Sequence, residues 1–320
     1  MNQGERSHRI KTLAGQLGFD RCGIAAAAPI PRGDFFREWL ASGHAGTMGY
    51  LHRHVESRID LRRWLPAANS VVVVALNYKQ TVTPKPADQP RGKTAMYAWG
   101  EDYHVVVREK LERLASQLRD EWGQPFEYRI CVDTSAITER ELAAMAGIGW
   151  IGKNTLVLHQ QLGSFFVLGE MICDLELTPD APETDHCGTC TRCLDACPTQ
   201  AFPKAYEMDA RKCISYLTIE HRGVIDPALA SKLGDWVFGC DVCQEVCPFN
   251  REAPEMREPR FQASDAVAFP VLNDILGWDE ELYASHVNGR AADRARRMMW
   301  KRNAEIALRN TAEHAEEPSP

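Results

Sequence analysis

The spacing of the cysteines between positions 187 and 247 constrains this chain more than any other sequence feature. The first four follow the pattern C-x2-C-x2-C-x3-C and precede Pro198. The second four repeat the C-x2-C-x3-C ending before Pro248, with their first member displaced upstream. Bacterial ferredoxins that hold two [4Fe–4S] clusters carry this run. We therefore expect eight cluster ligands: Cys187, Cys190, Cys193, Cys197, Cys213, Cys240, Cys243 and Cys247.

The assignment of these cysteines to two clusters should follow a crossed pattern. In two-cluster ferredoxins the last cysteine of each run binds the other cluster. Cys247 should therefore join the first three cysteines, and Cys197 should join Cys213, Cys240 and Cys243. Zinc sites also use Cys-x2-Cys pairs, but two Cys-x3-Cys-Pro endings favour clusters over zinc. Three cysteines remain, in apolar surroundings typical of buried thiols: Cys22, Cys131 and Cys173.

Length and hydrophobic periodicity predict an α+β protein of three parts. A chain of 320 residues suggests two or three domains, and we place them at 1–180, 181–255 and 256–320. The first part alternates helices and strands, with a buried strand at Val71–Tyr78 and a hairpin joining strands at Thr155–His159 and Ser164–Cys173. The second part is ferredoxin-like. The third is a small helical region, with disorder expected at 316–320.

The cellular setting follows from what the sequence lacks. We find no signal peptide and no apolar run of membrane-spanning length, which predicts a cytoplasmic protein without a membrane partner. Thiols stay reduced in that compartment, so clustered cysteines indicate metal or redox chemistry. A ferredoxin alone needs only about 60 residues. The rest of the chain must bind the acceptor of the electrons or its target.

A glycine-rich run follows residue 146 and contains Gly147, Gly149 and Gly152, with Lys153 and Asn154 directly after it. Glycines this close together allow sharp turns or close approach to a flat group, and the two polar side chains add hydrogen-bond donors. The run suits a large anionic or amide-bearing cofactor, or a structural turn. It matches neither the Rossmann fingerprint nor a P-loop.

Several segments in this order resemble the epoxyqueuosine reductase family: Leu76–Tyr78, Tyr97–His104, Val132–Ser135, Thr138–Arg140, Ala146–Thr155 and the split cysteine motif ending in Cys-Pro-Phe-Asn. The resemblance covers nearly the whole chain. It implies a cobalamin-binding α/β sandwich domain ahead of the ferredoxin-like domain. It also implies a two-electron reduction of epoxyqueuosine to queuosine in a tRNA anticodon loop. Co(I) cobalamin, supplied with electrons by the two clusters, would carry out this reduction.

The resemblance also assigns residues to the reaction. Asp133 matches the family's proposed proton donor, which would need a desolvated pocket to stay protonated; the alternative is a helix cap or an Asx turn. Asp102-Tyr103-His104 starts like the Asp-x-His-x-x-Gly motif that supplies a cobalt ligand, but Val107 stands where the glycine should be. We therefore expect His104 to be a pocket residue or an ordinary helix start, and not a cobalt ligand. The implied cobalamin contacts are Tyr103, His104, Asp133, Thr134, Arg140, Gly149, Trp150, Gly152, Lys153 and Asn154.

The net charge of −7 does not indicate a nucleic-acid binder, so RNA binding would need a local basic patch. Basic residues at i, i+4, i+7 and i+11 predict one stripe of a helix through 290–301, which would face phosphate or only solvent. The expected tRNA contacts are Arg290, Arg294, Arg297, Lys301 and Arg302.

We also expect a monomer with an external low-potential electron donor. Two alternatives from other functional classes remain. One is a reductive dehalogenase-like enzyme acting on a small organic substrate. The other is a non-catalytic, ferredoxin-type electron carrier.

Overall fold

A four-stranded sheet forms the centre of the computed structural model, which describes residues 1–82, 85–263 and 265–316. The strand order is β1 (Arg21–Ala26), β2 (Ser70–Asn77), β7 (Phe166–Cys173) and β4 (Tyr128–Cys131), and every pair is antiparallel. The two central strands are almost entirely buried, because their apolar side chains point to both faces. The tail at 317–320, where we expected disorder, lies outside the described residues.

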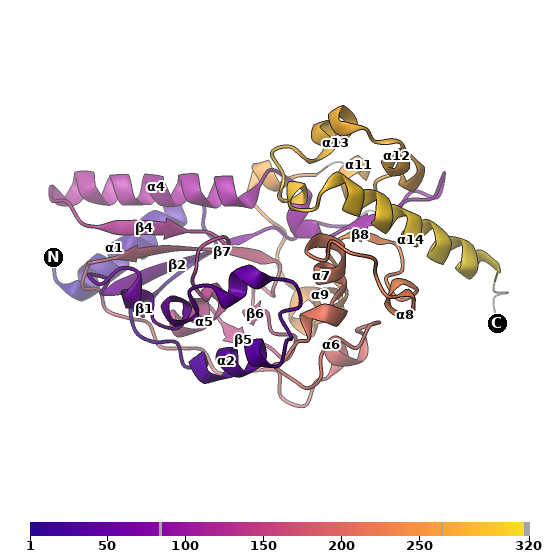
Figure 1. The fold of residues 1–320 in the computed structure, drawn as a ribbon. Coiled ribbons are helices and arrows are strands. Elements are labelled where there is room, and N and C mark those ends of the chain that lie inside the picture. The colour runs from indigo at the N-terminus through magenta and orange to yellow at the C-terminus, as the bar shows by residue number, and fades with distance from the viewer. Residues whose placement is uncertain (83–84, 264, 317–320) are drawn as a thin grey trace.

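Helices cover both faces of this sheet (Figure 1). Helices α1 (Gln3–Gln16) and α4 (Tyr103–Trp122) pack on one face, where Val72 and Val74 point toward them. Helix α5 (Glu139–Met145) packs on the other face, against Val71 and Val73. Side chains of successive strand residues alternate between faces, so β2 contributes to both cores. The expected α/β sandwich is confirmed, and α2 (Gly33–Ala41) and α3 (Val55–Ile59) complete it.

The predicted hairpin between 155–159 and 164–173 forms only as a single antiparallel bridge between His159 and Gly163, and the two strands beyond it do not pair with each other. Strand β6 (Val157–Leu158) pairs with β5 (Trp150–Ile151), and β7 joins β2 and β4 in the central sheet. Gly149 lies so close to β6 that a Cβ there would be 1.9 Å from the Leu158 carbonyl oxygen. Gly149 therefore allows the glycine run to approach β6 closely. Strand β7, whose residues are largely apolar, takes a buried position at the centre of the four-stranded sheet.

The cysteine segment is built from short elements: α6 (Arg192–Asp195), α7 (Ile214–Ile219), α8 (Pro227–Ala230), β8 (Trp236–Phe238), α9 (Val242–Glu245) and α10 (Pro248–Arg251). Strand β8 pairs in parallel with β3 (Lys93–Thr94). Since β3 belongs to the N-terminal part of the chain, this pairing joins the cysteine segment to the sandwich.

The C-terminal region consists of α11 (Asp265–Ala268), α12 (Leu272–Gly277), α13 (Glu280–Val287) and α14 (Arg297–Glu316). It shares one apolar core with Val237 and Phe238 of β8. The predicted single helix through 290–301 is wrong, because Ala291–Arg294 forms a separate 3-10 turn and Ala295 is extended. Within the described parts of the chain, no helix is both long and apolar enough to span a bilayer.

Candidate functional site

The cluster cysteines gather in two groups that match the crossed pattern. Burial, and then the charges of the nearby Cys247 and Cys187, raise the pKa of Cys193 to about 11. Burial also raises the pKa of Cys240, with further contributions from Cys213 and Cys197. Thiols act on each other in this way only at short range. Cys247 therefore lies close to Cys193 and Cys197 close to Cys240, where the predicted crossed pattern would place them.

The first group of thiols is enclosed by residues near the glycine run. The Trp150 indole Nε1 donates to Sγ of Cys187 over 3.5 Å. The ammonium of Lys153 donates to the carbonyl oxygens of Gly188 at 2.6 Å and Cys190 at 2.9 Å. Both side chains, which the resemblance assigned to cobalamin, thus contact the cysteine loop. A Cβ at Gly152 would meet the Leu158 side chain at 2.4 Å, so this glycine serves internal packing.

A cavity of about 300 Å³ lies beside the second group of thiols. Its wall on the sandwich side is largely apolar and includes Tyr78, Tyr97 and Phe166. Two of the expected cobalamin contacts, Arg140 and Asn154, also line it. The opposite wall contains the cysteines of the second group: Cys197, Cys213, Cys240 and Cys243.

Arg140 has its guanidinium inside this concave region. Its Nη1 donates to the Thr155 carbonyl oxygen over 2.7 Å. The side chain is exposed, yet burial by the surrounding walls lowers the pKa of Arg140. An accessible cation in partly desolvated surroundings is suited to hold an anionic or amide-bearing group.

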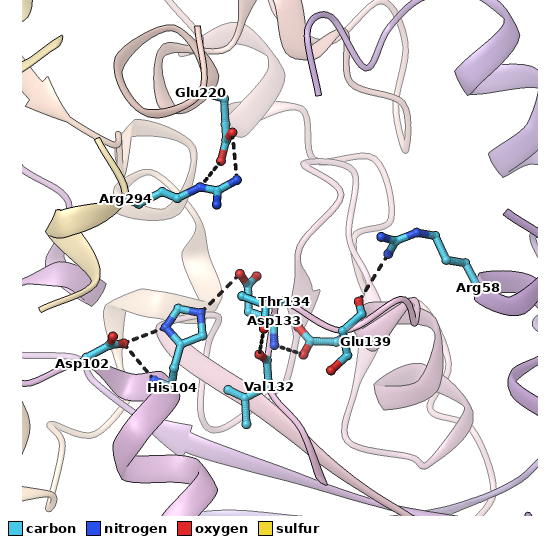
Figure 2. A network of polar contacts seen from close by, with 10 residues as sticks. Arg58, Asp102, His104, Val132, Asp133, Thr134, Glu139, Glu220 and Arg294 are labelled. Carbon is cyan, nitrogen blue, oxygen red and sulfur yellow. Dashed lines mark hydrogen bonds and ion pairs between the residues drawn. The ribbon is translucent and has the colours of Figure 1, made fainter. Parts of the chain in front are cut away.

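Asp133 and His104 meet at the ends of β4 and α4 (Figure 2). Nε2 of His104 lies 3.3 Å from Oδ2 of Asp133, and its Nδ1 lies 2.6 Å from Oδ1 of Asp102. Asp102 caps α4, because its carboxylate also accepts the backbone N–H of His104. The His104 ring stacks on Tyr103 with centroids 4.1 Å apart. Three residues thus fix the imidazole, with one carboxyl group on each side of it and the Tyr103 ring against its face.

The charges of this arrangement keep His104 protonated at neutral pH. Burial lowers the pKa of His104, but hydrogen bonds to Asp102 and Asp133 outweigh it and raise the pKa to about 9. The Asp133 side chain is 57% exposed, so the protein alone does not provide the desolvated pocket that we expected. The helix-cap alternative is wrong, since the residue that precedes α5 is Thr138. Thr134 follows in a tight turn, with its N–H donating to the Val132 carbonyl oxygen at 2.6 Å.

Two carboxylates near Asp133 were missed in the sequence. Glu139 accepts a hydrogen bond from the Asp133 backbone N–H, and Glu170 is fully buried in β7 close to Glu139. Glu170 had a recognisable signal, because it is a lone acid inside the apolar stretch of a central strand. A buried acid in such a strand needs a partner or a proton.

The expected tRNA contacts do not form one stripe. Arg290 donates to the Trp99 carbonyl oxygen at 2.7 Å, and Arg302 donates to that of Leu217 at 2.7 Å. Arg297 is paired with Glu280 at 2.8 Å. Arg294 is paired with Glu220 at 2.8 Å and faces the Asp133 region from above (Figure 2). Lys301, in the second turn of α14, is partly buried.

Comparison with known proteins agrees with these features. The family model "4Fe-4S double cluster binding domain" matches residues 186–250, and the model "Epoxyqueuosine reductase QueG, DUF1730" matches residues 58–134. An epoxyqueuosine reductase of Xanthomonas campestris is 40% identical over 306 residues, which is 94% of this chain and 86% of the relative.

Solved structures of epoxyqueuosine reductases share the fold as well. One, determined with an epoxyqueuosine-modified tRNA-Tyr stem loop, has a TM-score of 0.91 and 30% identity over 97% of this chain and 83% of its own. Another, from Bacillus subtilis with its catalytic aspartate loop swung out of the active site, has a TM-score of 0.89 and 29% identity over the same shares of the two chains.

The sandwich joined to a double-cluster domain defines an iron–sulfur oxidoreductase. The chain carries two [4Fe–4S] clusters in the segment that the cysteine spacing indicated. Within that class, the chain belongs to the epoxyqueuosine reductase family. Because the chain belongs to this family, we set aside the two alternatives of a reductive dehalogenase-like enzyme and a non-catalytic electron carrier.

Proposed function

We propose that this protein converts the epoxide of epoxyqueuosine, in a tRNA anticodon loop, into the alkene of queuosine. The reaction consumes two electrons and two protons, breaks both C–O bonds of the epoxide, and releases its oxygen as water. The observation that carries the proposal is the Asp133 carboxyl group in contact with a protonated imidazole, next to a cavity that the thiols of the second cluster line. Family membership supplies the identity of the substrate.

The residues present fit both cofactors. Two groups of four thiols suit two cubane clusters, and the largely apolar cavity with Arg140 and Asn154 suits part of a corrin with its amide side chains. When bound, cobalamin would supply the strongly reducing centre for C–O cleavage, with electrons that arrive singly through the clusters. Arg140 and Asn154 would contact it, whereas Trp150 and Lys153 would hold the first cluster.

Asp133 is the proposed general acid. Opening of the epoxide leaves an alkoxide, and protonation of that oxygen makes it a competent leaving group. The charge of Asp133 acts on Tyr97 and Arg140, which both line the cavity, so the carboxyl group lies near bound substrate. Bound cobalamin and the modified base would cover the exposed side of Asp133. They would thus provide the desolvation that the protein alone lacks.

His104 is the proposed source of the proton that Asp133 passes on. Its imidazolium form faces the Asp133 carboxyl group directly, and Asp102 holds the ring in place. After Asp133 gives up one proton, His104 can replace it, which suits a reaction that needs two protons. Asp133 lies in a turn with positive φ, and the structure of a Bacillus subtilis epoxyqueuosine reductase has its catalytic aspartate loop swung out of the active site.

Docking of tRNA is proposed over the mouth of the site, where Arg294 and Arg58 lie on either side of Asp133 (Figure 2). An external low-potential donor would reduce the clusters, and the protein would act as a monomer in the cytoplasm. Arg290 and Arg302 donate to backbone carbonyl oxygens, so we assign them to the scaffold and not to tRNA.

The test is an assay on a tRNA stem loop that carries the epoxide, with cobalamin and a low-potential reductant. Asp133→Asn should keep the visible absorption of clusters and cobalamin but lose at least about 10²-fold in turnover, as expected when a general acid is removed. Asp120→Asn, near the distant end of α4, is the matched control and should be fully active. Wild-type turnover by Asp133→Asn would remove Asp133 from the mechanism.

A further inference from the structure

A pair of carboxyl groups lies beneath the Asp133 turn, inside the α5 side of the sandwich. Glu170 is 0% exposed, and its neighbours across the sheet are Val73 and Cys131. Apart from the facing Glu139 carboxyl group, neither oxygen of Glu170 has a hydrogen-bond partner in the described residues. A buried polar group with so few hydrogen bonds costs folding free energy. This cost indicates that Glu170 has a functional role at its position.

Glu139, the upper member of the pair, connects it to Asp133. Its carboxylate accepts the backbone N–H of Asp133, as Figure 2 shows. Asp133 has φ of +54°, a left-handed conformation that is uncommon for a residue with a side chain. The hydrogen bond to Glu139 therefore holds the backbone in the conformation that directs the Asp133 carboxyl group toward His104.

Glu170 is fully buried and Glu139 is half-buried, and like charges this close together disfavour ionisation of both carboxyl groups. Burial, and then the charge of Glu139, raise the pKa of Glu170 well above its usual range. Burial, and then the charge of Asp133, raise the pKa of Glu139 to about 7. The other charged groups that act on Glu139 are His104 from α4, which opposes this rise, and its neighbour Arg140. At neutral pH the proton is therefore on Glu170, and Glu139 is close to its midpoint.

We propose that Glu139 is a positioning residue that holds the Asp133 turn in its reactive conformation while ionised, and that Glu170 is its permanently protonated, hydrogen-bond-donating partner. A second proton, on Glu139, weakens the bond to the Asp133 N–H and loosens the turn. The inference rests on the proposed function of Asp133 and adds a pH-dependent control of that same site.

Amide hydrogen exchange of the cluster-loaded protein tests the positioning role without reference to turnover. Protection of the peptide that covers 132–135, corrected for the intrinsic effect of pH, should increase as pH rises from 6 to 8. Glu139→Gln should make protection independent of pH and reduce it about tenfold or more at pH 8, since a hydrogen bond to a charged acceptor is the stronger kind. The control Glu141→Gln, on the same helix and near Arg32 at 3.7 Å, should leave the pH dependence intact.

The pH profile of turnover tests the role of Glu170. Wild-type turnover should fall as pH drops below about 7. Glu170→Gln keeps a neutral donor toward Glu139 and should retain this acid limb, whereas Glu170→Leu removes the donor and should move the limb to higher pH. Equal profiles for the Gln and Leu variants, or protection at 132–135 that ignores pH in the wild type, would overturn the proposal. Full turnover by Asp133→Asn would instead refute the acid role of Asp133. The hydrogen-exchange measurement would still report whether Glu139 holds the 132–135 turn.

Discussion

Nε2 of His104 lies 3.3 Å from Oδ2 of Asp133, and this contact joins the start of α4 to the end of β4. The two residues are 29 positions apart, and the sheet brings them together because α4 packs over β7 and β4. Asp102 fixes the other nitrogen of the ring at 2.6 Å. The result is a short chain of proton-binding groups that ends at the proposed acid.

Replacement of His104 by Gln should lower turnover by about 10²-fold, the low end of what positioned proton transfer contributes. The pKa of His104 is raised to about 9, so wild-type turnover should decline above pH 9, where the imidazolium loses its proton. This alkaline limb should be absent in His104→Gln. The measurement is turnover number against pH, with His286→Gln on the exposed face of α13 as the control. An unchanged alkaline limb in His104→Gln would exclude the histidine as proton source.

Trp150 should tune the potential of the first cluster. Its indole N–H donates to Sγ of Cys187, and hydrogen bonds to cluster sulfurs stabilise the reduced state, which carries more negative charge. Trp150→Phe should therefore shift the midpoint potential of one cluster to a more negative value and leave the other unchanged. A redox titration followed by electron paramagnetic resonance measures both clusters. Trp64→Phe, in the sandwich, should shift neither, and a shift of both clusters by Trp150→Phe would contradict the assignment.

The cysteine spacing was sufficient to predict the double-cluster segment, which the family model for such a domain matches at residues 186–250. The buried strand β2 was equally visible, since its residues are apolar on both faces. Strand pairing was not visible. Strand β7 could pair with a near neighbour in the sequence or enter the central sheet, and that choice depends on the packing of all the other strands.

The roles of Lys153 and the basic residues show a second limit of the sequence. A lysine next to a glycine run looks like a cofactor ligand, but its ammonium is taken up by two carbonyl oxygens of the cysteine loop. Arg290 and Arg302 likewise donate to backbone carbonyl groups. Free main-chain carbonyls attract cations wherever the chain folds irregularly, and their positions cannot be inferred from residue spacing.

Glu170→Gln should stabilise the protein, and more so at alkaline pH. The pKa of Glu170 is raised in the folded state, so the folded protein keeps a proton that the unfolded chain releases. Stability therefore falls as pH rises above the unfolded pKa of the carboxyl group. The neutral amide removes this dependence, so its advantage over the carboxyl group should grow by up to about 1.4 kcal/mol for each pH unit above the unfolded pKa.

Thermal unfolding under anaerobic conditions at pH 5 and pH 8.5 measures this difference. The melting temperature of Glu170→Gln should exceed that of the wild type at pH 8.5 and approach it at pH 5. The matched control is Glu112→Gln, an exposed acid on α4 that contacts Tyr128. If Glu170→Gln lowered the melting temperature at both pH values, the buried carboxyl group would be stabilising the folded protein and the prediction would be wrong.

Arg294 should be a tRNA contact at the mouth of the site. Its side chain is 52% exposed, and its guanidinium lies 5.6 Å above the Tyr50 ring, facing Asp133 in Figure 2. A phosphate near this position would compete with Glu220 for the guanidinium, since Arg binds both anions in bidentate fashion. Arg294→Ala should therefore weaken binding of the stem loop and reduce the slope of log K against log salt by about 1.

The control for this prediction is Arg9→Ala. Arg9 is also paired with a glutamate, Glu121, but it lies on α1 near the far end of α4. Its removal should leave both affinity and salt slope unchanged, because a surface that contacts no RNA phosphate releases no counterions. Equal slopes for Arg294→Ala and the wild type between about 50 and 200 mM salt would mean that Arg294 only anchors Glu220. The RNA would then have to approach the site from the side of Arg58, whose guanidinium faces the Ser135 carbonyl oxygen at 3.4 Å.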